Sequence, residues 1–288
     1  MGRVPFSRSQ LPDKMGHMHT SFPGDTQDDQ ERSERAHYVR SPAPWLAACS
    51  DLGKRHQTNQ DAVCLAVREE PERIAVLAIS DGVSSEAGSE VASVVATETA
   101  IEQLIALRHD AVAADQAFVE AFHQANLAVL AAPKGPSACT LIVAIVEAGS
   151  IAVANVGDSR AYWLGDDGTC QLLSTDDSMA QARIMLGMAR EDAEQSIQAH
   201  AITKWLGRRS TNCAPSVVTL APQGDGWLLL CSDGLWNYAS SPETMSELLG
   251  TAVQQSPDPK QISENLVSWA NAQGGRDNIT VIVVRLKV

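Results

Sequence analysis

The sequence lacks the features of a secreted or membrane-spanning protein. Its N-terminus is polar, so no secretory signal is visible. The longest apolar stretch, residues 137–157, is interrupted by Glu147-Ala-Gly-Ser, which is typical of a hairpin turn rather than of a membrane helix. The six cysteines include no CxxC pair, and most lie in apolar, strand-like segments. We therefore expect reduced, packed thiols and a cytoplasmic protein without a membrane partner.

Basic residues are also scarce. The chain of 288 residues has 22 Lys and Arg against 35 Asp and Glu, which gives a formal net charge of -13. The first 44 residues are neutral, so the whole excess lies in residues 45–288. Such a surface repels nucleic acid and anionic membranes, and it attracts divalent cations instead.

Two regions differ in composition. Residues 1–44 are rich in Ser, Pro, Asp, Gln and Arg without an apolar period, which predicts a flexible tail. Residues 45–288 alternate between strand-like apolar runs and amphipathic segments, and we expect helices over 86–107, 114–131, 176–187, 189–195, 242–250 and 259–272. Because strands and helices are grouped rather than alternating, the pattern predicts an α+β domain of stacked sheets flanked by helices.

Several apolar runs end in aspartate. "IAVLAISDG" delivers Asp81 and "WLLLCSDG" delivers Asp233, and each run is long enough for a strand buried on both faces. Asp61, Asp158 and Asp277 also lie at or beside strand ends. A single Asp before Gly is most often a turn residue, but five such residues at strand ends are harder to explain in this way.

Carboxylates that cluster repel one another, and a divalent cation removes that repulsion. Mg²⁺ and Mn²⁺ prefer carboxylate, carbonyl and water oxygens, whereas no Cys/His cluster is present for zinc. Two such ions indicate hydrolysis of a phosphate ester by a water that bridges them. No G-x-S-x-G elbow, P-loop or kinase signature suggests another chemistry.

The order of these motifs resembles the protein phosphatase 2C family of metal-dependent serine/threonine phosphatases, in its bacterial form. Seven segments carry the resemblance over residues 45–288: "SDLGKRHQTNQDA", "AISDGVSSEAGSEVAS", "ACTLIVAIV", "VANVGDSRAYWL", "STDDSMAQ", "LCSDGLWN" and "GGRDNITVIVV". The resemblance implies an αββα sandwich of two antiparallel sheets with two metal ions at one end. It also implies phosphorylated Ser/Thr proteins as substrates, and signalling opposite a serine/threonine kinase.

The family's metal site can be placed on this sequence by the resemblance. Asp61 and Asp81 would hold the metal pair, with Asp81 bridging and Gly82 offering its carbonyl. Asp233 and Asp277 would hold the first metal. Asp158, with Asp233, would bind a third, weaker ion. Asn278 and Asn59 would orient the ligands from behind.

This sequence departs from the family pattern at three places. His56 stands where the family often has the arginine that grips the substrate phosphate, and either His56 or the adjacent Arg55 is expected to take that role; an ordinary loop histidine is the alternative. Gln60 replaces the usual Glu, which removes one charge near the ligands. Val83-Ser84-Ser85 offers no histidine as general acid, so a metal-bound water or His56 would protonate the leaving group.

Residues 175–214, which we call the flap, correspond to a variable segment of the family. Its basic side chains are candidates for substrate contact or members of a solvated face: Arg183, His200, Lys204, Arg208 and Arg209.

Three functions fit the sequence. The first is a Mn²⁺- or Mg²⁺-dependent protein serine/threonine phosphatase. The second is a pseudophosphatase that binds phosphoproteins without turnover, which the departures at His56, Gln60 and Val83 suggest. The third is a phosphatase of small molecules or nucleotides.

Overall fold

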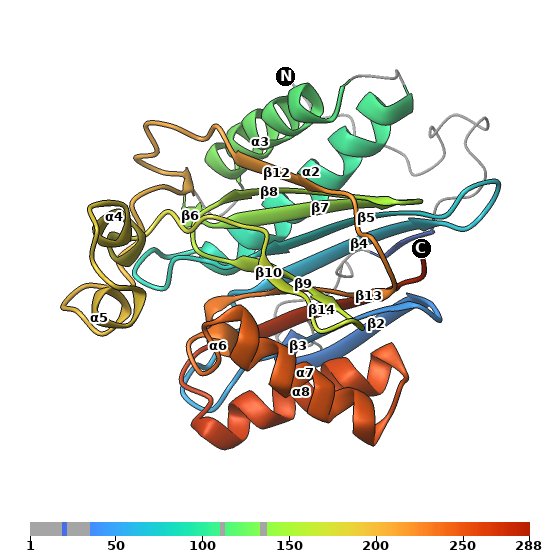
Figure 1. Cartoon of the computed structure of the whole chain (residues 1–288). Helices are drawn as coiled ribbons and strands as arrows, with labels where there is room; N and C mark the ends of the chain where they lie inside the picture. Colours follow the sequence, from blue (N-terminus) through green and yellow to red (C-terminus); the bar gives the residue numbers. More distant parts are fainter. Residues whose placement is uncertain (1–18, 22–34, 110–112, 133–136) are drawn as a thin grey trace.

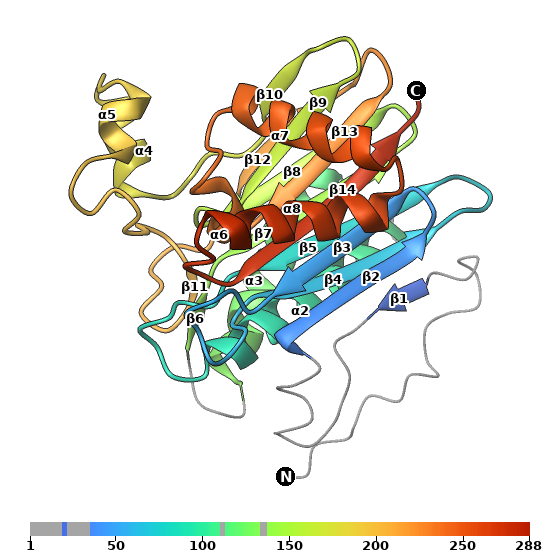
Figure 2. The same cartoon turned by 90° about the horizontal axis from the view of Figure 1, so that it is seen from below.

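Two six-stranded antiparallel sheets lie face to face, with helices on the outer face of each (Figure 1). The computed structural model describes residues 19–21, 35–109, 113–132 and 137–288. Seen from below, the helices of one outer layer lie in front of the strands (Figure 2). The predicted α+β sandwich is confirmed.

The strands of each sheet come from distant parts of the chain. The first sheet has the order β1 (His19–Ser21), β4 (Ala62–Arg68), β5 (Ile74–Ser80), β7 (Leu141–Glu147), β8 (Ser150–Val156) and β12 (Ser216–Leu220). The second has the order β10 (Cys170–Leu172), β9 (Arg160–Gly165), β13 (Gly226–Cys231), β14 (Ile279–Leu286), β3 (Leu46–Asp51) and β2 (His37–Ala43). β11 (Leu206–Gly207) and β6 (Ala138–Cys139) form a separate short pair.

The helices cover the two outer faces. α2 (Ser89–His109) and α3 (Ala114–Leu130) pack on the first sheet, while α6 (Asp233–Trp236), α7 (Pro242–Gln255) and α8 (Pro259–Gln273) pack on the second. α4 (Met179–Met185) and α5 (Arg190–Glu194) project from one end of the sandwich (Figures 1 and 2). Within the described residues, no helix is both long enough and apolar enough to cross a membrane.

The central strands are buried on both faces, as their unbroken apolar runs predict. Successive side chains of a strand point to opposite faces. In β13, Leu228 and Leu230 therefore enter the core between the sheets, whereas Leu229 packs against the helices of the second sheet. Each fully buried leucine contributes about 1.5–3 kcal/mol. β13 is thus held firmly along its length and fixes the residues that follow it.

The prediction that residues 1–44 form a flexible tail is wrong for residues 37–43. His37–Ala43 form β2, which pairs antiparallel with β3 at the edge of the second sheet. Of the remaining tail, 1–18 and 22–34 lie outside the described residues, and 19–21 form β1 beside β4. α2 begins at Ser89 rather than at residue 86. None of the six cysteines forms a disulfide, and four of them are buried.

Candidate active site

The five aspartates lie at the same end of the two sheets because of how their strands pair. Asp61 precedes β4 and Asp81 follows β5, and the pairing of Ala62 with Ser80 brings these two strand ends together. In the second sheet, Cys231 at the end of β13 pairs with both Val281 of β14 and Arg160 of β9. The three aspartates that flank those strand ends, Asp233, Asp277 and Asp158, therefore gather at one edge.

Ser232 joins the two sheets at this edge. Its hydroxyl donates a 2.7 Å hydrogen bond to Oδ2 of Asp61. The same hydroxyl accepts a 3.0 Å hydrogen bond from the backbone N–H of Thr280, and the N–H of Ser232 donates to the carbonyl of Thr280. Asp61 from the first sheet is therefore held by a residue that two backbone contacts fix in the second.

Burial and mutual repulsion disfavour the charged forms of these carboxyl groups. Burial raises the pKa of Asp61 to about 7 and that of Asp158 to about 7. Burial, with repulsion by the neighbouring aspartates, also raises the pKa of Asp81 and Asp233 well above the usual range. For Asp81 the repelling groups are the other four aspartates of the set, so all five interact electrostatically.

Two carboxylate oxygens at this edge are buried without a hydrogen-bond partner. They are Oδ1 of Asp61 and Oδ1 of Asp233. In the described parts of the chain, no three acidic, imidazole or thiol groups already converge closely enough to enclose an ion. The unpartnered oxygens are a donor set that suits a hard divalent cation.

Two asparagines fix the loops that carry Asp61 and Asp277. Oδ1 of Asn59 accepts a 3.1 Å hydrogen bond from the N–H of Asp61, and its amide donates to Ser50 Oγ at 2.9 Å. Asn278 accepts a 2.8 Å bond from the N–H of Gln60 and donates to the carbonyl of Leu52 at 2.8 Å. Both asparagines lie behind the aspartates, where they hold backbone rather than reach outward.

The two glycines that follow Asp81 and Asp233 are required by close packing. A β-carbon on Gly82 would lie 2.7 Å from the carbonyl oxygen of Ser89, at the start of α2. A β-carbon on Gly234 would lie 2.0 Å from the carbonyl oxygen of Asn278. Both distances are far below an ordinary contact, so each glycine lets a neighbouring segment approach an aspartate.

Comparison with known proteins agrees with this geometry. The family model of protein phosphatase 2C matches residues 53–271. The chain belongs to the protein phosphatase 2C family. It is 31% identical over 245 residues to the serine/threonine protein phosphatase PstP of Mycobacterium tuberculosis, which covers 82% of this chain and 44% of that protein. It is 34% identical over 146 residues to the serine/threonine phosphatase stp of Listeria innocua, which covers 50% of this chain and 55% of that one. The chain thus spans about half the length of these curated relatives.

A solved phosphatase 2C structure gives the same picture of the fold. The catalytic domain of PstP in complex with two manganese ions superposes with a TM-score of 0.63 at 26% identity. The superposition covers 87% of this chain and 99% of that one. The phosphatase 2C fold is therefore shown for this chain, and the PstP structure is one in which this fold holds two manganese ions.

The positions that depart from the phosphatase 2C pattern lie close to the aspartates. Nε2 of His56 is 3.2 Å from Oδ1 of Asp277, so this histidine borders the cluster. Arg55 is exposed. The Gln60 amide is hydrogen-bonded to Ser89 Oγ and ties the Asp61 loop to α2. The backbone of Val83 bonds to the carbonyl of Ala138 at 2.9 Å.

The basic residues of the flap have different surroundings. Arg183 bonds within the flap, to the Ser196 hydroxyl and the Ile197 carbonyl. Arg208 pairs with Glu86 at 3.1 Å, and the His200 ring lies 5.7 Å from that of Trp236. Arg209 adopts a positive φ of 61°. Lys204 lines a pocket.

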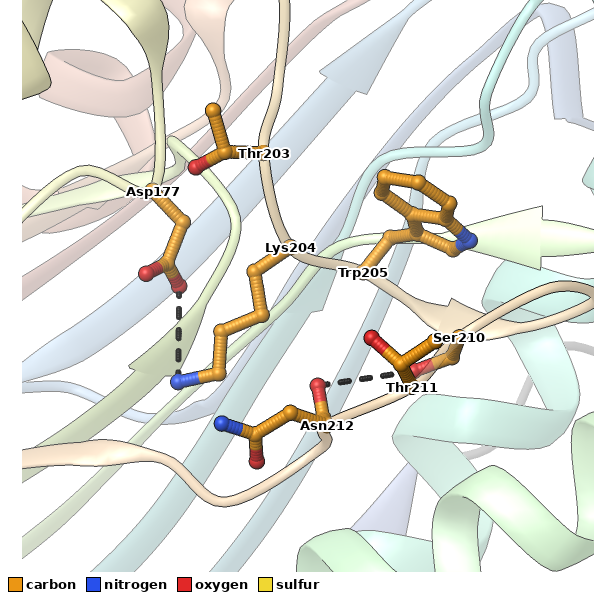
Figure 3. A pocket seen from close by; sticks show the side chains of 7 residues that line it. All are labelled: Asp177, Thr203, Lys204, Trp205, Ser210, Thr211 and Asn212. Carbon is orange, nitrogen blue, oxygen red and sulfur yellow. Dashed lines mark hydrogen bonds and ion pairs between the residues drawn. The ribbon is translucent and has the colours of Figure 1, made fainter.

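That pocket has a volume of about 280 Å³, and the residues that line it all belong to the flap. In Figure 3 the Lys204 amine reaches toward Asp177 on the opposite wall, 3.9 Å away. Oδ2 of Asp177 also accepts a 3.0 Å bond from the N–H of Gly157, which directly precedes Asp158. The pocket and the aspartate cluster therefore share one short segment of backbone.

Sequence reasoning missed three residues that hold the aspartates. Arg35, within the expected tail, donates to the carbonyl of Asp61 at 2.6 Å and to that of Glu90 at 3.1 Å. Thr140 Oγ1 accepts from the N–H of Asp81 at 3.0 Å, and Asn237 donates to Oδ2 of Asp233 at 3.1 Å. Thr140 and Asn237 stand inside the family segments, which was a usable signal, whereas nothing in the sequence marks Arg35.

Proposed function

We propose that this protein is a divalent-metal-dependent phosphatase that hydrolyses phosphoserine and phosphothreonine in proteins. The observation that carries the proposal is the gathering of five aspartates from both sheets, of which Asp61 and Asp158 are buried, with unpartnered oxygens on Asp61 and Asp233. Such a cluster is costly without a cation, because buried carboxylates lose hydration and repel one another. Family membership and the relatives' names support the phosphatase reading.

The proposed ligands divide between the sheets. Asp61 and Asp81 of the first sheet and Asp233 and Asp277 of the second would hold two ions, with the Gly82 carbonyl as a further oxygen donor. Asp158 would join Asp233 at a third ion, because it is the first of the charged neighbours that raise the pKa of Asp233. Manganese is the ion present in the PstP relative, and magnesium has the same preference for oxygen ligands.

The chain's own residues would position the reaction. Bound ions would activate water and neutralise the phosphoryl charge. Ser232, Asn59 and Asn278 hold the ligand loops in place before substrate arrives, which fits the need for preorganised charge. The geometry favours His56 over Arg55 for contact with the phosphate or the leaving-group oxygen, because His56 borders Asp277.

The substrate class rests on the relatives. Two relatives are named serine/threonine phosphatases, and this chain would act on phosphorylated Ser/Thr proteins made by a serine/threonine kinase of the same cytoplasm. Phosphopeptides are the first substrates to test. A panel that also contains a nucleoside monophosphate and p-nitrophenyl phosphate separates a protein phosphatase from a small-molecule phosphatase.

The experiment compares the wild-type protein with Asp81→Asn and with the matched control Asp115→Asn, an exposed aspartate on α3. We expect Mn²⁺-stimulated release of phosphate from the phosphopeptide, loss of activity with chelator, and loss with Asp81→Asn only. Calorimetry measures Mn²⁺ binding in parallel. Full activity of Asp81→Asn would overturn the metal assignment, and phosphopeptide binding without turnover would favour the pseudophosphatase.

A further inference from the structure

Arg160 is a buried charge that the metal site does not use. It lies in β9 with its side chain 1% exposed. Its guanidinium donates from Nε to both carboxylate oxygens of Asp176, at 3.0 and 3.1 Å, and from Nη2 to Oδ2 at 2.7 Å. The Trp236 ring covers its face at 3.7 Å from the ring centroid. A buried arginine needs partners on every N–H, and these contacts occupy only part of them.

Glu194 of the flap supplies another of those partners. Its Oε1 accepts from Arg160 Nη2 at 3.1 Å, and its two oxygens lie 2.8 and 2.7 Å from the Ser240 hydroxyl. Arg190, one turn earlier in α5, reaches the same carboxylate at 3.0 Å. Burial opposes its charge, but bonds from Ser240 and the two arginines hold the pKa of Glu194 below its usual value. Glu194 is thus a charged flap residue seated in the body of the domain.

The part of the flap that carries α4 and α5 has few apolar contacts to hold it. A short backbone ladder closes its base, where Thr203 N–H donates to Asp177 at 2.7 Å and Met179 N–H donates to Ala201 at 2.9 Å. The buried apolar cluster beyond this ladder consists of three alanines, with Ile184 packed against it. Leu186 and Ile197 are 88% and 86% exposed. With so few buried apolar contacts, the position of α4 and α5 depends on polar anchors.

The same anchor reaches the active site. Asp176, held by Arg160, is followed by Asp177, which lines the pocket of Figure 3 and bonds to Gly157 beside Asp158. Trp236, stacked on Arg160, ends the helix that begins with Asp233. A change in the contact between Glu194 and Arg160 would therefore also change the pocket that a substrate protein would meet.

We propose that Glu194 is a positioning residue: it clamps the flap to Arg160 and Ser240, and this clamp sets the activity toward phosphorylated proteins. The inference rests on the proposed function, because it concerns that function's substrates. A small ester reaches the aspartates without touching the flap and does not need the clamp. A phosphoprotein has to pass beside the flap and the Lys204 pocket, so its binding depends on where the flap is held.

The test compares Glu194→Ala with Glu191→Ala, which removes an exposed carboxylate from the same helix. Hydrogen exchange over residues 179–199 reports the flap directly. The kinetic parameters kcat and KM are measured with Mn²⁺ for a phosphorylated protein and for p-nitrophenyl phosphate. Glu194→Gln is the conservative variant, since its amide oxygen still accepts from Ser240.

For Glu194→Ala we expect flap exchange about tenfold faster, since charge-assisted hydrogen bonds are among the stronger ones. We expect kcat/KM for the phosphoprotein to fall about tenfold, mainly through KM, which is the sign of lost binding. Activity on p-nitrophenyl phosphate stays within about twofold, because no catalytic contact is removed. Glu191→Ala behaves as wild type and Glu194→Gln falls between.

Unchanged flap exchange in Glu194→Ala would overturn the clamp. Faster exchange with an equal loss on both substrates would show damage to the whole site, and faster exchange with no loss would show a structural role only; either result overturns the positioning role. If the wild-type protein hydrolyses neither substrate, the proposed function fails, and with it the kinetic part of the inference. The exchange measurement then still decides whether Glu194 holds the flap.

Discussion

Gly234 determines how closely Asp233 and Asp277 lie to each other at the edge of the second sheet. A β-carbon there would lie 2.0 Å from the carbonyl oxygen and 2.9 Å from the carbonyl carbon of Asn278. Both atoms belong to backbone, which a rotamer change cannot move aside. Gly234→Ala must therefore push the start of α6 away from Asn278, and with it Asp233 away from Asp277.

The expected size follows from packing. Overpacking costs about 3 kcal/mol when backbone has to shift, which for a domain of this size lowers Tm by roughly 6 °C or more. A displacement of about 1 Å at a catalytic group can cost about 100-fold in rate. We therefore expect both lower stability and a much larger loss of metal-dependent activity, measured by thermal unfolding and by phosphopeptide hydrolysis.

Gly250 provides the control. It lies inside α7 with nothing within 4 Å of where a β-carbon would stand. Gly250→Ala should raise stability by about 0.5–1 kcal/mol, because alanine is the better helix former, and it should leave activity unchanged. Equal Tm values for Gly234→Ala and wild type, or a stability loss without any loss of activity, would refute the reasoning.

Three further predictions concern the residues around the cluster. Asp81→Asn removes a charge that four aspartates repel, so the metal-free protein should gain about 1 kcal/mol of stability. Mn²⁺ should no longer raise the Tm of this variant in thermal scans. A metal-free variant that is less stable than the wild type would contradict this reasoning. Arg35→Met removes bonds to the carbonyls of Asp61 and Glu90 and should lower the urea-unfolding free energy by about 1–2 kcal/mol. His56→Gln replaces the imidazole 3.2 Å from Asp277 with an amide that cannot act as a general acid, so kcat for phosphopeptide hydrolysis should fall about tenfold or more, whereas Arg55→Gln should leave kcat unchanged.

The sequence was most informative for strands that are buried on both faces. β5 and β13 could be predicted with their ends, because apolar runs of that length leave few alternatives. The aspartates at those ends could be grouped because they all interrupt such runs. The flap helices were also expected, and the structure places them at Met179–Met185 and Arg190–Glu194, within the predicted segments.

The sequence was least informative where a contact is long-range or purely geometric. β2 is an edge strand with mixed exposure and contains Pro42, so it has no clear apolar period. Arg35 acts on a backbone carbonyl 26 residues away, which no side-chain pattern records. The glycines after Asp81 and Asp233 could be predicted to lie where the backbone turns sharply or approaches another group closely, but the sequence does not show which segment each one admits.

Asp61 shows why the cluster is better explained by a bound cation than by five independent turns. A turn aspartate is solvated and keeps an ordinary pKa. Asp61 is fully buried, burial raises its pKa to about 7, and one of its oxygens has no partner. Yet Ser232, Asn59 and Arg35 all form hydrogen bonds that hold Asp61 in this position. A cation would stabilise a carboxylate that is held this firmly in an unfavourable place, and the proposed divalent ion, shared with Asp81 and Asp233, would supply that charge.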